Sequence, residues 1–167
     1  YRNNGNGTFT DVTAACGVGG AGTTLAVTWT DFDGDGDLDL VVGNDFGSTV
    51  ERNRVYRNDG PVPGGGPFSW QFTEVGAALG ADLAIYCMGI APGDFDRDLD
   101  LDYYFTNLGR NVLLRNDGPA GFADVATPTG TELTFDPVVP SLFKVSWSCG
   151  FADFDRDGWL DLFVSNG

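Results

Sequence analysis

The chain has 167 residues, of which 42% are hydrophobic and 13% are aromatic, the composition of a globular protein with a buried core. Its 24 acidic residues against 9 Lys and Arg give a formal charge of −15, which excludes nucleic acid and anionic membrane surfaces as partners. The sequence has no His and a single lysine, Lys144, so it also excludes His-based catalysis and His-ligated metal centres.

The ends and the cysteines of the chain set further limits. No apolar run approaches the 18 or so residues that span a bilayer, so we expect no membrane insertion. The chain opens at Tyr1 without a Met, and we expect a processed or cropped segment. Three cysteines, Cys16, Cys87 and Cys149, leave all three pairings open and do not decide the compartment.

A repeat of nearly sixty residues organises the whole chain. Three Asp-rich segments read DFDGDGDLD, DFDRDLDLD and DFDRDGWLD and are 63 and 59 residues apart, starting at Asp31, Asp94 and Asp153. A second motif reads YRNNG, YRNDG and LRNDG with spacings of 55 and 58 residues, starting at Tyr1, Tyr56 and Leu114. Three copies of one unit therefore cover nearly the entire sequence.

Each copy carries short apolar runs that predict four strands separated by turns. The first strand leads into the Asp-rich segment, at Leu25–Trp29, Ala84–Ile90 and Leu142–Trp147. The second leaves that segment, at Leu38–Val42, Leu101–Phe105 and Leu160–Val164. The third spans Asn53–Asn58 or Asn111–Asn116, and the fourth is a Phe-led run that starts at Phe9, Phe72 and Phe122. Nothing has the pattern of a long amphipathic helix.

These elements predict an all-β fold made of β-propeller blades, about three four-stranded antiparallel repeats in a single domain, 1–167. The repeat units are approximately 1–54, 55–112 and 113–167, and residues 61–67 form a long hairpin loop in one blade. Each end of the chain supplies only half a blade, and three blades are fewer than a propeller usually needs. We therefore expect a larger propeller, or one closed by association with another chain, and favour the first.

The Asp-rich segments are the candidate metal sites. Oxygen ligands at alternate positions of a tight turn converge on one point, which suits Ca²⁺, and without a cation the crowded carboxylates would repel one another. Position 7 would contribute its main-chain carbonyl, so its side chain is free to vary. We expect about three Ca²⁺ per chain, held at positions 1, 3, 5, 7 and 9 by Asp31, Asp33, Asp35, Asp37, Asp39, Asp94, Asp96, Asp98, Asp100, Asp102, Asp153, Asp155, Asp157, Trp159 and Asp161.

An EF-hand loop begins in the same way but requires a Glu at position 12. Position 12 here is Val42, Phe105 or Val164, inside a predicted strand. The sequence therefore excludes an EF-hand. Isolated acidic turns of this kind are often merely solvated, but three copies in register favour metal ligation.

The motifs DFDGDGDLDL and DFDRDGWLDLFVSN, with the Arg-Asn motif and the Phe-led strand, resemble the FG-GAP/VCBS calcium-binding repeats. The likeness is greatest to the cartilage-acidic-protein and ASPIC/UnbV-like group, and the same loop type occurs in integrin α-subunit propellers. The resemblance implies an extracellular propeller with one Ca²⁺ per loop. One departure is at position 6, where Gly36 and Gly158 have Leu99 as their counterpart, so strain should weaken the second site.

Other recurrent residues favour structural roles. We expect Arg2, Arg57 and Arg115 to pair with nearby carboxylates rather than form a ligand-binding ring, and the recurrent Phe residues to pack in the core. Asn6-Gly7-Thr8 fits a hairpin turn better than a glycosylation site. Asp11, Glu74 and Asp124 also recur at one position, which leaves five acids for a catalytic alternative: Asp45, Glu51, Asp82, Glu132 and Asp136.

The sequence predicts a non-enzymatic, calcium-binding propeller module that serves as a scaffold for adhesion, recognition or assembly. The family resemblance implies that it is secreted or at the cell surface. A first alternative is a structural subunit that assembles head to tail into an extracellular ring or filament. A second is a carbohydrate-binding or glycosidase-type propeller. The expected partner is a protein, a carbohydrate or further copies of the chain.

Overall fold

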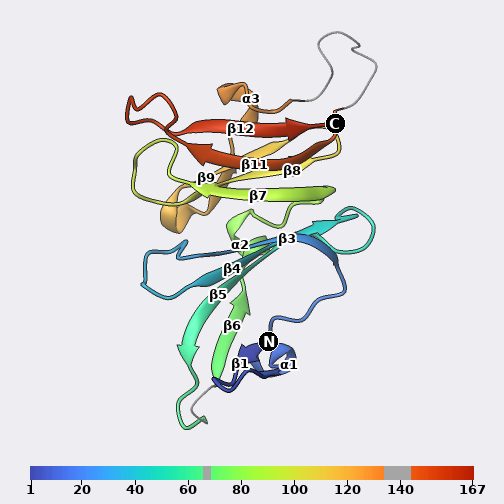
Figure 1. Cartoon of the computed structure of the whole chain (residues 1–167), viewed down its shortest axis with the longest axis vertical. Helices are drawn as coiled ribbons and strands as arrows, with labels where there is room; N and C mark the ends of the chain where they lie inside the picture. The colour runs from blue at the N-terminus through green and yellow to red at the C-terminus, as the bar shows by residue number, and fades with distance from the viewer. Residues whose placement is uncertain (66–68, 134–143) are drawn as a thin grey trace.

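The computed structural model describes residues 1–65, 69–133 and 144–167. The described ranges contain strands β1 to β12, arranged as two four-stranded and two two-stranded antiparallel sheets (Figure 1). The fold is all-β with propeller-like blades, as predicted, and the sheets do not close into a ring within these ranges. The sequence explains the antiparallel sheets: short apolar segments alternate with Gly-, Asn- or Asp-rich turns, and the chain reverses direction at each turn.

The first blade is the sheet β3-β4-β5-β6. Its strands are β3 (Thr23–Thr30), β4 (Asp39–Asp45), β5 (Arg54–Pro61) and β6 (Trp70–Glu74). The register places Leu40 of β4 between Trp29 of β3 and Tyr56 of β5. The long loop predicted at 61–67 joins β5 to β6, and its residues 66 and 67 lie outside the described ranges.

The second blade is the sheet β7-β8-β9-β10, and it repeats this arrangement. Its strands are β7 (Cys87–Gly93), β8 (Asp102–Asn107), β9 (Val112–Asn116) and β10 (Phe122–Asp124). A short 3-10 helix, η1 (Gly118–Ala120), forms the turn between β9 and β10. Tyr103 lies opposite Leu114, which is the same register as Leu40 and Tyr56 in the first blade.

Two hairpins complete the set of strands. The N-terminal hairpin pairs β1 (Arg2–Asn3) with β2 (Phe9–Thr10), and the C-terminal hairpin pairs β11 (Ser146–Ala152) with β12 (Asp161–Asn166). By repeat position they correspond to the last two and the first two strands of a blade, as expected from the sequence. The hairpins lie near opposite ends of the molecule (Figure 1).

Some predicted boundaries differ from the structure. The strand predicted at Ala84–Ile90 is β7, Cys87–Gly93. Just before it, the Tyr86 amide donates to the side-chain oxygen of Asn107 on β8 (2.8 Å) rather than to a main-chain carbonyl of that strand. In the segment predicted at 142–147, the first two residues lie outside the described ranges and β11 starts at Ser146. The repeat boundaries at 54/55 and 112/113 fall at the third strand of each blade, so the sequence repeat is offset from the sheets by half a blade.

The sequence did not predict three four-residue helices, α1 (Thr13–Cys16), α2 (Gly76–Leu79) and α3 (Ala126–Thr129). Each follows the last strand of a blade or half-blade and ends at a left-handed glycine with a φ of 73–77°. Those glycines are Gly17, Gly80 and Gly130. None of the helices in the described ranges has the length and apolarity to cross a lipid bilayer.

The hydrophobic core lies between successive sheets. One cluster, including Phe32, Val41, Tyr103 and Phe105, fills the space between the first and second blades. Another, including Tyr104 and Leu113, packs the second blade against the C-terminal hairpin. The innermost strands β3, β7 and β11 lie next to one another, as in a propeller.

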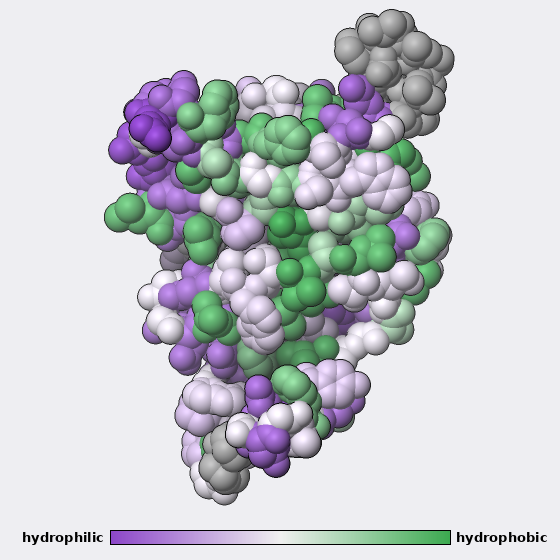
Figure 2. All heavy atoms as spheres, in the orientation of Figure 1, coloured by the Kyte–Doolittle hydropathy of each residue, from purple (hydrophilic) through white to green (hydrophobic). Residues whose placement is uncertain are grey.

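All three Asp-rich segments join the first and second strands of a sheet, so they emerge on one side of the molecule, at the left in Figure 1. Hydrophilic residues gather along this edge in Figure 2, most densely beside the C-terminal hairpin. Hydrophobic residues run down the middle of the same view, across the stacked sheets. The topology thus lines up the candidate metal sites along one face.

Candidate metal centres

The three Asp-rich segments are named loop 1 (Asp31–Asp39), loop 2 (Asp94–Asp102) and loop 3 (Asp153–Asp161). In every loop the carboxylates at positions 1, 3 and 9 come together, with one oxygen of each lying within 4.8 Å of the others. These groups are Asp31, Asp33 and Asp39; Asp94, Asp96 and Asp102; and Asp153, Asp155 and Asp161. Three separate groups of hard oxygen atoms of this kind suit a cation such as Ca²⁺.

The carboxylate at position 9 anchors its loop to the sheet. Asp39 Oδ2 accepts the amide of Phe32 at position 2 of its own loop (3.0 Å), and Oδ1 accepts the amide of Asn58 on β5 (2.8 Å). Asp102 repeats both bonds with Phe95 (3.0 Å) and Asn116 (2.9 Å). Both carboxylates are fully buried. In the third copy, Asp161 Oδ2 accepts the Phe154 amide at 3.2 Å.

The carboxylate at position 1 shapes the turn. Asp31 accepts the amides of Asp35 (3.1 Å) and Gly36 (3.0 Å), and Asp153 accepts those of Asp157 (3.1 Å) and Gly158 (3.0 Å). In loop 2 the corresponding residue accepts amides from positions 4, 5 and 6. Position 1 therefore holds the loop closed by charge-assisted hydrogen bonds.

Positions 5 and 7 of the predicted ligand set are placed differently. The position-5 carboxylates accept the amide of position 7, at 2.9 Å for Asp35, 3.0 Å for Asp98 and 2.8 Å for Asp157. They are not members of the three groups at 4.8 Å. The position-7 residues, whose carbonyls were expected to ligate, are thus fixed through their amides; they are Asp37, Asp100 and Trp159.

Two positions in each loop have a left-handed backbone. Position 6 has φ of 92° at Gly36, 91° at Gly158 and 78° at Leu99, so the strain expected at the leucine is present. Position 4 is also left-handed, with φ of 67° at Arg97 and 64° at Arg156. Sequence reasoning missed position 4, although Gly at that position in loop 1 was a signal for it.

In loops 1 and 2 the carboxylates at positions 3 and 9 have raised pKa values. Burial raises the pKa of Asp39 and of Asp102 to about 6, against the opposing effect of their two amide hydrogen bonds. At position 3, burial and then the charge of the position-5 carboxylate raise the pKa of Asp33 and of Asp96. Loops 1 and 2 therefore hold carboxylates whose charged form is disfavoured.

The donor set fits a hard cation. Asp96 Oδ1 is buried and has no hydrogen-bond partner among the described residues. A buried carboxylate oxygen without a donor carries an uncompensated desolvation cost, and a cation would offset it. The residues that converge offer oxygen atoms alone, the ligands that Ca²⁺ prefers. We conclude that the loops fit the metal that the sequence predicts.

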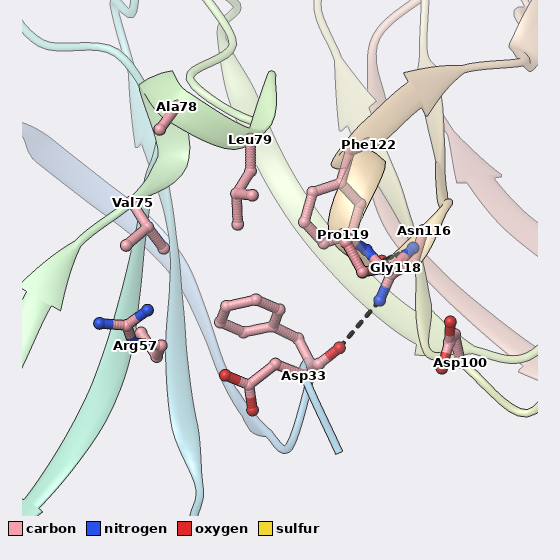
Figure 3. Close-up of a pocket in the computed structure, with 11 residues that line it drawn as sticks. Asp33, Arg57, Val75, Ala78, Leu79, Asp100, Asn116, Gly118, Pro119 and Phe122 are labelled. Atoms are coloured by element: carbon pink, nitrogen blue, oxygen red, sulfur yellow. Dashed lines mark hydrogen bonds between the residues drawn. The ribbon is translucent and has the colours of Figure 1, made fainter. Parts of the chain in front are cut away.

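Two contacts connect a loop with the neighbouring blade or hairpin. The side-chain amide of Asn116 on β9 donates to the carbonyl of Phe32 in loop 1 at 2.9 Å, drawn as a dashed line in Figure 3. The guanidinium of Arg97 in loop 2 lies over the indole of Trp159 in loop 3, 5.0 Å from the ring centre. The first contact is buried, whereas the second lies between exposed side chains.

A pocket of about 360 Å³ lies between the first and second blades, beside loop 1 (Figure 3). One wall is apolar and includes Val75, Leu79 and Phe122. Asp33 and Asp100, from two different loops, supply carboxylates to the opposite side. Arg57 also lines it, but its guanidinium is paired with Asp59 at 2.7 Å.

The structure gives most of the other recurrent residues the roles expected of them. Arg115 pairs with Asp117 at 2.7 Å, and Arg2 donates to Asn4, which replaces that aspartate in the first copy (3.0 Å). The recurrent acids before the helices each accept an amide two residues on, from Thr13, Gly76 and Ala126. Phe32 is buried as expected, whereas Phe9 and Phe154 are exposed.

Four of the five acids kept for a catalytic alternative have ion-pair or hydrogen-bond partners. Glu51 pairs with Arg54, Asp82 with Arg52, and Glu132 with Arg110. The carboxylate of Asp45 accepts the amide of Phe46 at 2.8 Å. Asp136 lies outside the described ranges.

Sequence reasoning also missed the two asparagines that connect the sheets to the loops. Asn58 and Asn116 each accept a glycine amide two residues on and donate to the carbonyl at position 8 of the loop in their own blade. The signal was present, because both belong to the recurrent Arg-Asn motif.

Comparison with known proteins gives one family. The model of the FG-GAP-like repeat matches residues 1–42, 31–105 and 94–164, three overlapping segments that follow the repeat found in the sequence. No curated protein matches the chain.

Proposed function

Because the chain belongs to the FG-GAP-like repeat family, we propose that it is a calcium-binding module of a propeller, with one Ca²⁺ per Asp loop. The observation that carries this is the threefold convergence of carboxylates at positions 1, 3 and 9. Position 5 and the main-chain carbonyl at position 7 are the further ligands in the proposal. The family is generally non-enzymatic, and the role proposed here is that of a scaffold for adhesion, recognition or assembly.

Calcium would act on stability. Bound Ca²⁺ supplies positive charge where the metal-free fold holds buried, mutually repelling carboxylates. Hydrogen bonds of the chain itself shape the loop: the carboxylate at position 1 closes the turn, and the carboxylate at position 9 connects it to the third strand. Because an ion that binds only the folded state stabilises it, the blades should gain stability with calcium concentration.

The location proposed is outside the cell or at its surface. Loops of this type in extracellular modules bind Ca²⁺ with dissociation constants of roughly 10⁻⁴ to 10⁻³ M. Such sites fill only where free calcium is millimolar. The formal charge of −15 is compatible with such a medium, because divalent cations and salt screen it.

Calorimetry of the chelator-treated chain tests the proposal. We expect isothermal titration to give about three bound Ca²⁺, and differential scanning to show a higher melting temperature at 5 mM Ca²⁺ than in chelator. Asp33→Asn should abolish one site, whereas Asp37→Asn, a matched loss of charge in the same loop, should keep all three because position 7 acts through its carbonyl. A melting temperature that does not respond to calcium, or fewer than two bound ions, would contradict the proposal.

A second candidate role is assembly of copies of this chain. The first blade exposes Val27, Trp29 and Trp70, and the C-terminal hairpin exposes Trp147 and Phe163. Exposed apolar side chains that gather on a protein surface mark contact surfaces. Sedimentation velocity at several concentrations tests it: head-to-tail association gives species larger than 17.7 kDa, and a monomer at every concentration argues against it.

A further inference from the structure

We propose that Asn116 couples loops 1 and 2, so that an ion held in one loop raises the affinity of the other. The inference rests on the proposed binding of calcium and goes beyond it, because it assigns an energetic link between two sites. Asn116 acts as a positioning residue: it is not itself one of the proposed ligands.

A continuous set of hydrogen bonds joins the two loops. At position 2 of loop 1, the Phe32 amide donates to Asp39 Oδ2 (3.0 Å), and the Phe32 carbonyl accepts from Asn116 Nδ2 (2.9 Å). The main-chain amide of Asn116 then donates to Asp102 Oδ1 in loop 2 (2.9 Å). Figure 3 shows the central bond between the two blades. One residue in each blade thus separates two buried carboxylates that are candidate ligands.

The link is removed from water. Asp39 and Asp102 are fully buried, Asn116 is 2% exposed and Phe32 is 7% exposed. When a buried hydrogen bond breaks, both groups lose a partner that water cannot replace, so the bonds hold their members in one arrangement.

The sign of the coupling follows from ordering. A carboxylate that takes up an ion must hold a fixed orientation, and for Asp39 this constrains the amide that it accepts from Phe32. The Phe32 carbonyl then fixes the side chain of Asn116, and the main-chain amide of Asn116 orients Asp102. Binding of the first ion therefore already orders part of the second loop. The second ion then loses less conformational entropy on binding, which gives positive cooperativity.

The first blade provides a matched control. Asn58 occupies the same repeat position as Asn116 and makes the same bonds within its own blade: its amide to Asp39 (2.8 Å), its side chain to the Leu38 carbonyl (3.1 Å), and an acceptor bond from Gly60 (3.0 Å). Asn116 makes these three bonds and also the one to the Phe32 carbonyl. Replacing either asparagine by Ala removes its intrablade side-chain bonds, but only Asn116→Ala removes the bond between blades.

The test is a calcium titration of the full, calcium-free chain followed by two-dimensional ¹H–¹⁵N NMR. The amides of Gly36 and Leu99, both at position 6, report on loops 1 and 2 separately. We expect Asp96→Asn, which disables loop 2, to weaken calcium binding at Gly36 by about fivefold, the lower end of typical coupling. In the Asn116→Ala background the same substitution should leave the Gly36 midpoint unchanged, and in the Asn58→Ala background the fivefold effect should persist.

A second NMR measurement tests the coupling if Asn116→Ala does not fold. In the Asp96→Asn chain, the side-chain amide signal of Asn116 should move together with the Gly36 amide as loop 1 fills. An Asn116 signal that stays still, or a Gly36 midpoint that does not depend on loop 2, overturns the coupling. If no loop amide of the unsubstituted chain responds to calcium, the proposed binding itself is wrong, and this result is distinct from the other two.

Discussion

Loops 1 and 3 share their motif but differ in their surroundings. Phe32 at position 2 of loop 1 is 7% exposed, whereas Phe154 at the same position of loop 3 is 78% exposed. Asp39 at position 9 is fully buried and accepts an amide at each oxygen, while Asp161 is half-buried and accepts the amide of its own loop. Loop 1 is covered by β5 and by the second blade; within the described residues, no such strands cover loop 3.

The difference shows which part of a candidate metal centre is local. The turn itself is present in both loops, and its position-1 hydrogen bonds and left-handed position 6 lie within the nine residues of the motif. Burial of the position-9 carboxylate comes from the third strand, whose asparagine supplies the second amide. The loop shape is thus a property of the motif, and the interior of the site is a property of the blade.

The largest expected effect distinguishes the two position-9 residues. Asp39→Ala leaves the amides of Phe32 and Asn58 without an acceptor, and we expect it to lower the free energy of unfolding by about 2–3 kcal/mol in chelator. Asp161→Ala removes one such bond at a partly exposed site, and the loss should be about 1 kcal/mol. Urea unfolding measures both, and equal losses would contradict the role given to the third strand.

The second prediction compares two glycines, one enclosed and one open. A Cβ on Gly43 in β4 would lie 2.4 Å from Cys87 Sγ in the neighbouring blade, so Gly43→Ala should destabilise the fold by about 1–3 kcal/mol. A Cβ on Gly150 in β11 would meet nothing within 4 Å, and Gly150→Ala should change stability by less than about 0.5 kcal/mol. Thermal or urea unfolding checks both. Adding Cys87→Ala to Gly43→Ala should recover part of the loss, and no recovery would place the clash elsewhere.

The third prediction gives loop 2 the glycine that loops 1 and 3 have at position 6. Leu99→Gly removes a side chain from a residue with φ of 78°, and we expect a gain of about 0.5–1 kcal/mol in stability and tighter calcium binding at loop 2. Leu99→Ala is the control, because it shortens the side chain but keeps the Cβ that causes the strain. A gain of the same size from the alanine would attribute the effect to exposure of the leucine rather than to the backbone.

The smallest effect concerns thiol reactivity at the two interfaces of the second blade. Burial raises the pKa of Cys87 and of Cys149 to about 12, so both stay protonated between pH 7 and 9. We expect iodoacetamide to modify neither appreciably in the folded chain at pH 8, and both to react in urea, where the pKa returns to its ordinary value. Of the two, the fully buried Cys87 should be the slower, as mass spectrometry over time can show. A rapid reaction of Cys87 would mean that the two blades separate readily.

Much of the fold was predictable because the same pattern of strands and turns recurs in the copies of the repeat. The apolar runs after each loop predicted β4, β8 and β12, and the Arg-Asn motif predicted β5 and β9. The end of β7 was also misplaced: Pro and Gly usually mark turns, but Pro92 and Gly93 both pair with β8, so the strand continues past the predicted end at Ile90. The short helices have too few residues to show a period, and only the recurrent glycine after each one, such as Gly80, indicates them.

The candidate site was predictable in its composition but not in its connections. Alternating aspartates indicated convergence, and positions 1, 3 and 9 do converge. That the Asp35 carboxylate would also accept the amide of position 7 depends on the detailed geometry of the turn. The bond from Asn116 to Phe32 spans 84 residues, and nothing in the sequence distinguishes Asn116 from Asn58, which makes no such bond among the described residues.

The half-blade offset between sequence repeat and sheet has a consequence for how such a protein grows. A unit such as 55–112 carries the last two strands of one blade, the first two of the next, and many of the contacts between them. If one such unit is copied in tandem, each new joint falls inside a sheet, where the β4–β5 register and the Asp39–Asn58 bond specify how the pieces join. Duplication then adds a whole blade without creating a new free edge, so arrays of different length can arise from a single repeated segment.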